Sequence, residues 1–148
     1  MNKKTENGLL PISRRVLLKT ASVLTGVLFL GLPSRAQSAG AGSVKHVSVP
    51  EFKRLMEQTK GAVIVDVRTP QEFQQGHIKG AILVPLQQLG QLVSGSMPDK
   101  DKPYLVYCRS ANRSAIAARQ LAQMGYTDVT NMLGGIVDWS RQGLPVVR

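Results

Sequence analysis

The stretch YLVYCRSANRSAIAARQL, from Tyr104 to Leu121, decides the interpretation of this chain. Its apolar start is typical of a buried strand, and its Ala-, Arg- and Leu-rich continuation is typical of a helix. Between the two stands Cys108, the only cysteine among 148 residues. Positive charge from Arg109 and Arg113, together with a helix N-terminus, stabilises a thiolate at such a junction. The sequence therefore predicts a reactive cysteine, with a buried, inert cysteine as the alternative.

The chain after Ser43 alternates short apolar runs with helical patterns. We expect strands at 46–49, 62–67, 81–85, 104–108 and 128–133, with helical segments after each of them. The second run, AVIVDV, is nearly all apolar, as is typical of a parallel strand covered on both faces. The alternation predicts an α/β domain in which helices cover both faces of a parallel sheet.

The turn after Cys108 is the candidate site, because ligands of open parallel sheets bind at the carboxyl ends of the strands. Backbone N–H groups of the turn and of the first helical residues are free to converge on one point there. The candidate loop residues are Arg109, Ser110, Ala111, Asn112, Arg113 and Ser114. We expect Arg109 or Arg113 to bind an anionic donor or to stabilise the thiolate, and the two serines to serve the loop or cap the helix.

Three motifs carry a resemblance to a known family. CRSANRS at 108–114 resembles the active-site loop of the rhodanese sulfurtransferases, in which Cys is followed by four residues and Arg. VDVRTPQEFQQGHIKGAILVP at 65–85 and NMLGGIVDWSRQGLPV at 131–146 resemble that family's upstream and closing motifs. The three motifs occur in the family's order and span nearly all of the chain after Ser43.

The resemblance implies one rhodanese domain over residues 43–148, with five parallel strands in the order 1-5-4-2-3 and Cys108 after the fourth. It also implies the reaction. The Cys108 thiolate takes the outer sulfur of thiosulfate or a similar small anion, carries it as a persulfide and passes it to a thiol or protein acceptor. This chemistry requires no metal or other cofactor.

Three other functions compete with sulfur transfer from a free donor. Phosphatases and arsenate reductases of similar fold use a loop one residue longer, so the short loop here favours sulfur transfer. A sulfur carrier that serves partner proteins is the main alternative, because it shares the chemistry. The intact Cys108 argues against a module used only for binding.

Residues near the loop receive supporting roles. Asp66 ends the second strand, so we expect it to accept hydrogen bonds from loop N–H groups or to pair with an arginine. Arg68 and Glu72 stand four residues apart and are predicted to form an ion pair. His77 is expected to be a hydrogen-bonded structural residue. The sequence offers no cluster of metal ligands.

Ala111 departs from the family pattern, since many members have glycine at this position. A positive φ would cost alanine about 1–2 kcal/mol. Asn112 tolerates that conformation better. We therefore expect the loop to form, with Asn112 as an alternative holder of the positive φ.

The first 39 residues resemble an export signal. A basic start precedes an uncharged apolar segment, Ala21 to Leu32, and small residues suited to cleavage follow it. SRRVLLK at 13–19 resembles a twin-arginine signal, which implies the export machinery as a partner and a periplasmic location. A Sec-type signal and an uncleaved anchor are the alternatives, although the apolar segment is short for a membrane span.

The net charge of +10 divides equally between this leader and the rest of the chain. Residues from Gly40 onward hold thirteen Lys or Arg against eight Asp or Glu. The moderate excess is typical of a solvated surface, and attraction of anionic small molecules or partners is the alternative. Only seven residues are aromatic, and none interleave with a basic stripe, so nucleic-acid binding is not expected.

Overall fold

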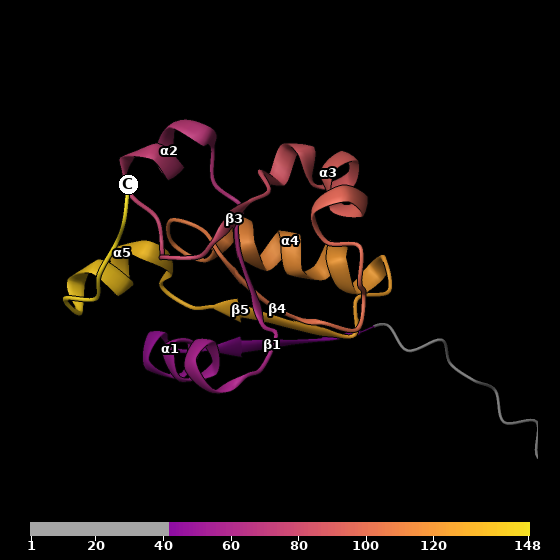
Figure 1. Cartoon of the computed structure of the whole chain (residues 1–148), viewed down its shortest axis with the longest axis horizontal. Coiled ribbons are helices and arrows are strands. Elements are labelled where there is room, and N and C mark those ends of the chain that lie inside the picture. Colours follow the sequence, from indigo (N-terminus) through magenta and orange to yellow (C-terminus); the bar gives the residue numbers. More distant parts are fainter. Residues whose placement is uncertain (1–41) are drawn as a thin grey trace, which may run out of the picture. The chain divides into compact units, whose positions relative to one another are not determined.

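The computed structural model describes residues 42–148, and the predicted export signal lies outside this range. Five strands and five α-helices alternate along it (Figure 1). The strands are β1 (Ser43–Val47), β2 (Val63–Asp66), β3 (Ile82–Leu83), β4 (Pro103–Tyr107) and β5 (Asp128–Met132). The helices are α1 (Val49–Gln58), α2 (Pro70–Gln75), α3 (Leu89–Ser96), α4 (Asn112–Gln123) and α5 (Gly135–Arg141), with a 3-10 turn, η1 (Leu86–Gln88), before α3.

The strands form one parallel sheet in the order β1-β5-β4-β2-β3, as predicted. β4 is the central strand and pairs with β2 and β5 on its two sides. Asp66 lies opposite Tyr107 in the register between β2 and β4. The carboxyl ends of these two strands therefore meet at the same edge of the sheet.

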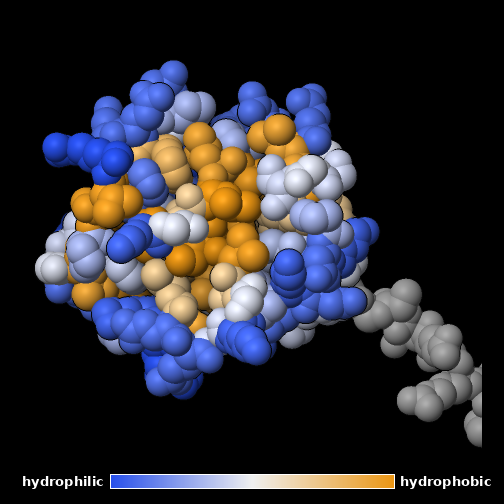
Figure 2. Space-filling view, viewed as in Figure 1, coloured by the Kyte–Doolittle hydropathy of each residue, from blue (hydrophilic) through white to orange (hydrophobic). Residues whose placement is uncertain are grey.

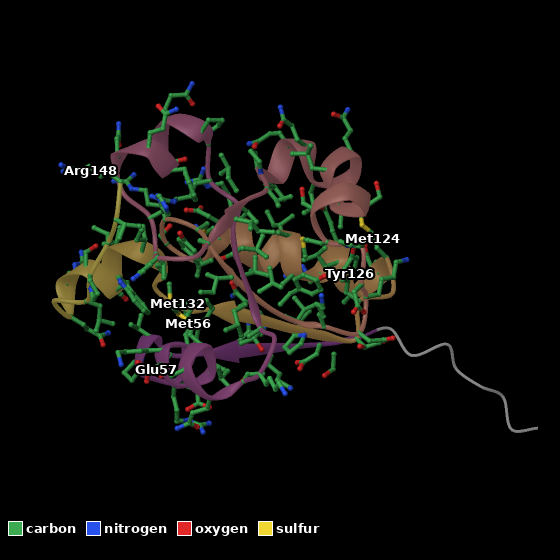
Figure 3. The ribbon with its side chains drawn as sticks, viewed as in Figure 1. Met56, Glu57, Met124, Tyr126, Met132 and Arg148 are labelled. Carbon is green, nitrogen blue, oxygen red and sulfur yellow. The ribbon has the colours of Figure 1, made fainter. Side chains whose placement is uncertain are left out.

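Each face of the sheet has its own apolar core. Figure 1 shows α3 and α4 on one side of the sheet and α1 on the other. Val106 and Cys108 belong to the core shared with α3 and α4, whereas Leu105 and Tyr107 belong to the core shared with α1 and α5. This alternation is the two-residue period of a strand covered on both sides. Met132 also belongs to the second core and lies above α1 (Figure 3). Figure 2 shows an apolar area in the middle of the viewed face, in the region of the edge strand β3.

Local sequence signals explain where several helices begin and end. Thr69 caps α2 by a reciprocal capping box with Glu72, and Pro70 occupies the first turn. Gly125 follows the end of α4 with φ 91°, a conformation that suits glycine. Within residues 42–148, none of the helices has the length and apolarity that crossing a membrane requires.

The predicted bounds of the first strand are wrong, and the other four predicted strands end one or two residues beyond the strands that form. The first strand covers residues 43–47 rather than 46–49, because Val49 is already helical and is buried beside Phe52 at the start of α1. The composition of Ser94 to Pro103 is typical of a loop, but α3 continues to Ser96 and the side chain of Met97 is buried beyond its end.

Candidate active site

The loop after β4 is held in place by the start of α5. The Cys108 carbonyl accepts a hydrogen bond from Ile136 N–H at 2.9 Å, and the Arg109 carbonyl accepts one from Val137 N–H at 3.2 Å. Gly135 permits this approach, because a Cβ atom there would lie 2.4 Å from the Arg109 carbonyl oxygen. The paired glycines of the closing motif thus bring α5 directly against the backbone of the cysteine loop.

These two carbonyl contacts also orient the loop N–H groups. In a trans peptide the N–H points opposite to the carbonyl of the same unit, so the N–H groups of Arg109 and Ser110 point away from α5. The Cys108 side chain also lies on the side of the sheet away from α5, in the core under α3 and α4. Within residues 42–148, no acceptor is found for the backbone N–H groups of 109–114. The loop therefore offers a run of unpaired donors next to Cys108.

Cys108 itself is more buried than the polar loop sequence suggests, with only 1% of the residue exposed. It is a free thiol, and its Sγ lies 3.4 Å from the Ser114 Oγ. The buried hydroxyl of Ser114 also lies 3.1 Å from the Ala111 carbonyl oxygen. Ser114 therefore does more than serve the loop, because its hydroxyl is able to donate to the cysteine sulfur. Its position in the first turn of α4 is the signal that could have indicated this contact.

Ala111 is the loop residue with positive φ, at φ 76° and ψ −17°. The alternative that Asn112 takes this conformation is wrong, because Asn112 is the first residue of α4. The left-handed turn brings the Ala111 carbonyl to Ala115 N–H at 2.9 Å, which closes the first turn of the helix. The loop therefore has the left-handed backbone conformation that glycine adopts without strain, and Ala111 adopts it with strain.

The predicted ion pair between Arg68 and Glu72 is wrong. Glu72 instead forms a bidentate pair with Arg113, with both N–O distances 2.7 Å. Hydrogen bonds from Arg113 and from Thr69 N–H lower the pKa of Glu72 to about 2. The same pair raises the pKa of Arg113. Arg113 therefore ties the start of α4 to α2, and its guanidinium is already occupied.

Arg68 pairs with Asp66, one of the two arrangements expected for that carboxylate. Both carboxylate oxygens accept from the Arg68 guanidinium, at 2.6–2.9 Å, and the pair is buried. Arg68 also donates to the Gly76 carbonyl at 2.7 Å and lies over the Tyr107 ring. Asp66 and Arg68 therefore form a buried support below the loop, and no loop N–H reaches Asp66.

Tyr107 completes this support, and no pattern in the sequence indicated that role. Its hydroxyl accepts a hydrogen bond from Ile78 N–H at 3.1 Å. Burial raises the pKa of this phenol, and the nearby Asp66 charge adds to the effect. The residue before the cysteine therefore fixes the segment after α2.

His77 is hydrogen-bonded, as predicted. Its Nδ1 lies 3.1 Å from the Phe73 carbonyl oxygen, and its ring stacks on the ring of Phe73. Trp139 is buried in the core under α1 and α5. Among residues 42–148, no group of three or more His, Cys, Asp or Glu side chains could hold a metal ion.

Arg109 is exposed and lines a pocket of about 720 Å³ beside the loop. Arg68 and Gly76 form part of the same wall, and Ile136 and Val146 face them. Of the two loop arginines, Arg109 is thus the one whose guanidinium has no acceptor within residues 42–148.

Comparison with known proteins places this arrangement in a family. The rhodanese-like domain family matches residues 48–142. A sulfurtransferase of Allochromatium vinosum is 38% identical over 104 residues, which cover 70% of this chain and 95% of that protein. A thiosulfate sulfurtransferase of Escherichia coli K12 is 40% identical over 74 residues, covering 50% of this chain and 70% of that protein.

The chain belongs to the rhodanese-like family. A crystal structure of a rhodanese-related protein from Thermoplasma volcanium shares the fold, with a TM-score of 0.58 and 34% identity over 70% of this chain and 97% of that one. The prediction of a rhodanese-type sulfurtransferase is thereby confirmed at the level of the family. The rhodanese fold and its strand order are confirmed as well.

Proposed function

We propose that this rhodanese is a periplasmic sulfurtransferase that moves sulfane sulfur through a Cys108 persulfide. Its donor is thiosulfate or a similar small anion, and its acceptor is a thiol. The observation that carries the proposal is the run of unpaired loop N–H groups beside the single thiol. An inert core cysteine does not require such donors, whereas hydrogen bonds from them stabilise the negative charge of a persulfide anion.

The chemistry proceeds in two balanced displacements. In the first, the Cys108 thiolate attacks the outer sulfur of thiosulfate, the donor's S–S bond breaks, and sulfite leaves with the electron pair. In the second, an acceptor thiolate attacks the outer sulfur of the persulfide, and the electron pair of the broken bond returns to the Cys108 Sγ. No net oxidation occurs in the protein.

The individual residues divide this work. The loop N–H groups and the Ser114 hydroxyl stabilise negative charge on sulfur. Arg109 attracts the anionic donor from solvent, because its guanidinium is exposed and unpaired among the described residues. Arg113 acts through its ion pair with Glu72, which holds the loop against α2.

Mass spectrometry of the purified protein after incubation with thiosulfate tests the proposal. We expect one added sulfur atom, which cyanide removes. The Cys108→Ser variant should gain none, and Ser114→Ala should load more slowly because the sulfur loses a hydrogen-bond donor. A wild-type protein that stays at its original mass would refute the proposal. Loading only by a persulfidated partner protein would instead favour the sulfur carrier.

The periplasmic location rests on the leader sequence alone. Replacing both Arg14 and Arg15 by lysine keeps the charge but removes the arginine pair that a twin-arginine signal requires. We expect the variant to remain in the cytoplasm, as measured by immunoblotting of periplasmic extracts. Undiminished export would indicate a Sec-type signal, and wild-type protein held in the membrane fraction would indicate an anchor.

A further inference from the structure

The open edge of the sheet carries an apolar surface that the candidate active site does not use. β2 pairs with β4 over all four of its residues, but with β3 only over Val65 and Asp66. Within residues 42–148, the rest of β2 therefore has no neighbouring strand on its outer side. Figure 2 shows an apolar area in this region of the molecule. We call its partly exposed apolar residues the edge patch: Val63, Ile64, Ala81, Ile82, Leu83 and Leu86.

The edge patch continues into a long uncharged segment. No charged residue stands between Ala81 and Pro98, through β3, η1 and α3, although 19% of the chain is charged. The exposed positions of this segment hold mainly glutamine, serine and glycine, and Leu92 on α3 is 36% exposed. Charged residues usually cover the outer face of a surface helix and protect an open sheet edge. Their depletion is instead typical of a protein interface.

Leu83 offers a backbone donor and a backbone acceptor at this edge. Val84 N–H donates to the Asp66 carbonyl at 2.9 Å, so it points toward β2. Successive residues of a strand direct their backbone groups to opposite sides, so the N–H and carbonyl of Leu83 point away from β2. An antiparallel strand is able to exchange two hydrogen bonds with a residue in this orientation. If that strand is β3 of a second copy, Leu83 pairs with its own counterpart across a two-fold axis.

Charge indicates which partner fits the edge patch. From Gly40 onward the chain holds thirteen Lys or Arg against eight Asp or Glu, so two copies repel each other over much of their surface. At the edge patch two copies approach without bringing like charges together. The same surface has no charge that would attract an acidic or a basic partner. An apolar edge with both a donor and an acceptor is therefore complementary to itself.

We propose that two copies of this chain form a two-fold symmetric dimer through the edge patch. The two β3 strands meet antiparallel at Leu83, so the two sheets join into one continuous sheet. Because β3 is short, most of the stabilisation comes from the apolar side chains that the two patches bury against each other. Cys108 follows β4, which β2 separates from this edge, so both cysteine loops lie outside the interface. The inference is independent of the proposed function.

Sedimentation equilibrium of the full chain over a range of concentrations tests the dimer. We expect a reversible equilibrium between monomer and dimer. Leu83→Lys should raise the dissociation constant at least roughly tenfold, because two lysines would face each other across the two-fold axis. The matched control is Ile116→Lys, which changes an apolar residue that is 41% exposed on α4, outside the edge patch. It should leave the dissociation constant at the wild-type value.

Hydrogen exchange locates the interface without any substitution. The Leu83 amide should exchange roughly tenfold more slowly in concentrated than in dilute wild-type protein, since its outward N–H gains an acceptor in the dimer. The Val84 amide already donates to Asp66 within one copy, so its exchange should not depend on concentration. Higher ionic strength should strengthen the dimer, because salt screens the repulsion between two basic domains.

Several results would overturn the dimer. A wild-type chain that remains monomeric at every concentration excludes it. Equal weakening by Leu83→Lys and Ile116→Lys, or a Leu83 amide that stays unprotected in the concentrated protein, places the contact elsewhere. Dissociation by salt indicates a charged interface instead of the edge patch. Sulfur loading of Cys108 is a separate measurement, and its failure overturns only the proposed function.

Discussion

At the scale of single residues, Ala111 stores strain in the candidate active site. It is the one non-glycine residue with positive φ between residues 42 and 148. Ala111→Gly should relieve roughly 1–2 kcal/mol of that strain. The greater conformational entropy of the unfolded glycine variant should lower the free energy of unfolding by about 0.4–1 kcal/mol. We expect a net stabilisation of about 0.5–1 kcal/mol in urea unfolding.

A second alanine-to-glycine change in the same helix provides the control. Ala115 lies in the first turns of α4 with ordinary helical geometry, so Ala115→Gly should destabilise the protein by about 1 kcal/mol. Opposite signs at the two positions are the expected result. Equal losses would mean that the left-handed turn imposes no strain on Ala111.

The ion pair of Glu72 with Arg113 gives a prediction about pH. The pKa of Glu72 falls from 4.5 to about 2 in the folded protein, through the hydrogen bonds from Arg113. A lowered carboxylate pKa stabilises the fold above the unfolded value and loses this effect as the pH falls toward the folded value. Both side chains are less than a third exposed, so we expect about 1–3 kcal/mol from the pair at neutral pH.

Comparing the wild type with Glu72→Gln isolates this contribution from the other carboxylates. The difference in the free energy of unfolding should be greatest at pH 6–7 and should shrink between about pH 4.5 and 2. A difference that stays constant over this window would mean that the pair contributes nothing through its charge. Glu57, which pairs with Lys53 on the exposed surface of α1, provides the control. Glu57→Gln should have little effect at any pH.

At the scale of elements, the contact between α5 and the cysteine loop depends on Gly135. Its φ is 62°, and an added Cβ would meet the Arg109 carbonyl oxygen at 2.4 Å. Gly135→Ala should therefore cost about 2–5 kcal/mol, as strain and overpacking add. Persulfide loading should slow at least tenfold, because the loop is displaced.

Gly143 separates the backbone strain from the contact. It also has a positive φ, of 71°, but a Cβ there would meet nothing within 4 Å. Gly143→Ala should cost only about 1–2 kcal/mol and leave the loading rate near that of the wild type. If the two variants behave alike, the approach of α5 to the loop has no part in sulfur loading.

Signals within an element were enough to predict the elements and their order. The start of α2 is encoded within four consecutive positions, by Thr69, Pro70 and Glu72, and the structure shows the N-terminal cap that these residues form. Contacts between elements were not predictable in the same way. The rule for residues four apart paired Glu72 with Arg68, yet its partner is Arg113, which lies 41 positions away. Arg68 pairs instead with the carboxylate of Asp66, at the end of β2.

At the scale of the whole molecule, the site joins segments from most of the domain. The family motifs identified Cys108 and its loop, because those residues are consecutive in the sequence. They gave no indication of the pocket, whose walls come from α2, α5 and the tail. Neither the burial of Cys108 nor the support from Tyr107 follows from local composition, since both depend on how the two cores close around β4.

The C-terminal tail fastens one of these walls. Val147 forms an antiparallel bridge to His77, with two backbone hydrogen bonds of 2.8 Å. Arg148, labelled beside α2 in Figure 3, donates to the Gln75 carbonyl at 3.2 Å. The bridged segment presents the Gly76 carbonyl to Arg68, so the tail also supports the buried ion pair.

Deleting residues 146–148 should therefore loosen the segment after α2 without unfolding the sheet. The loss of these hydrogen bonds should cost about 1–3 kcal/mol. Hydrogen exchange of the His77 amide should accelerate strongly, because Val147 is its only acceptor among the described residues. The Val67 amide, bonded to the Tyr107 carbonyl at 3.0 Å inside the sheet, should exchange faster only by the global loss of stability. Equal acceleration at both amides would show that the tail stabilises the whole domain uniformly, rather than this wall of the site.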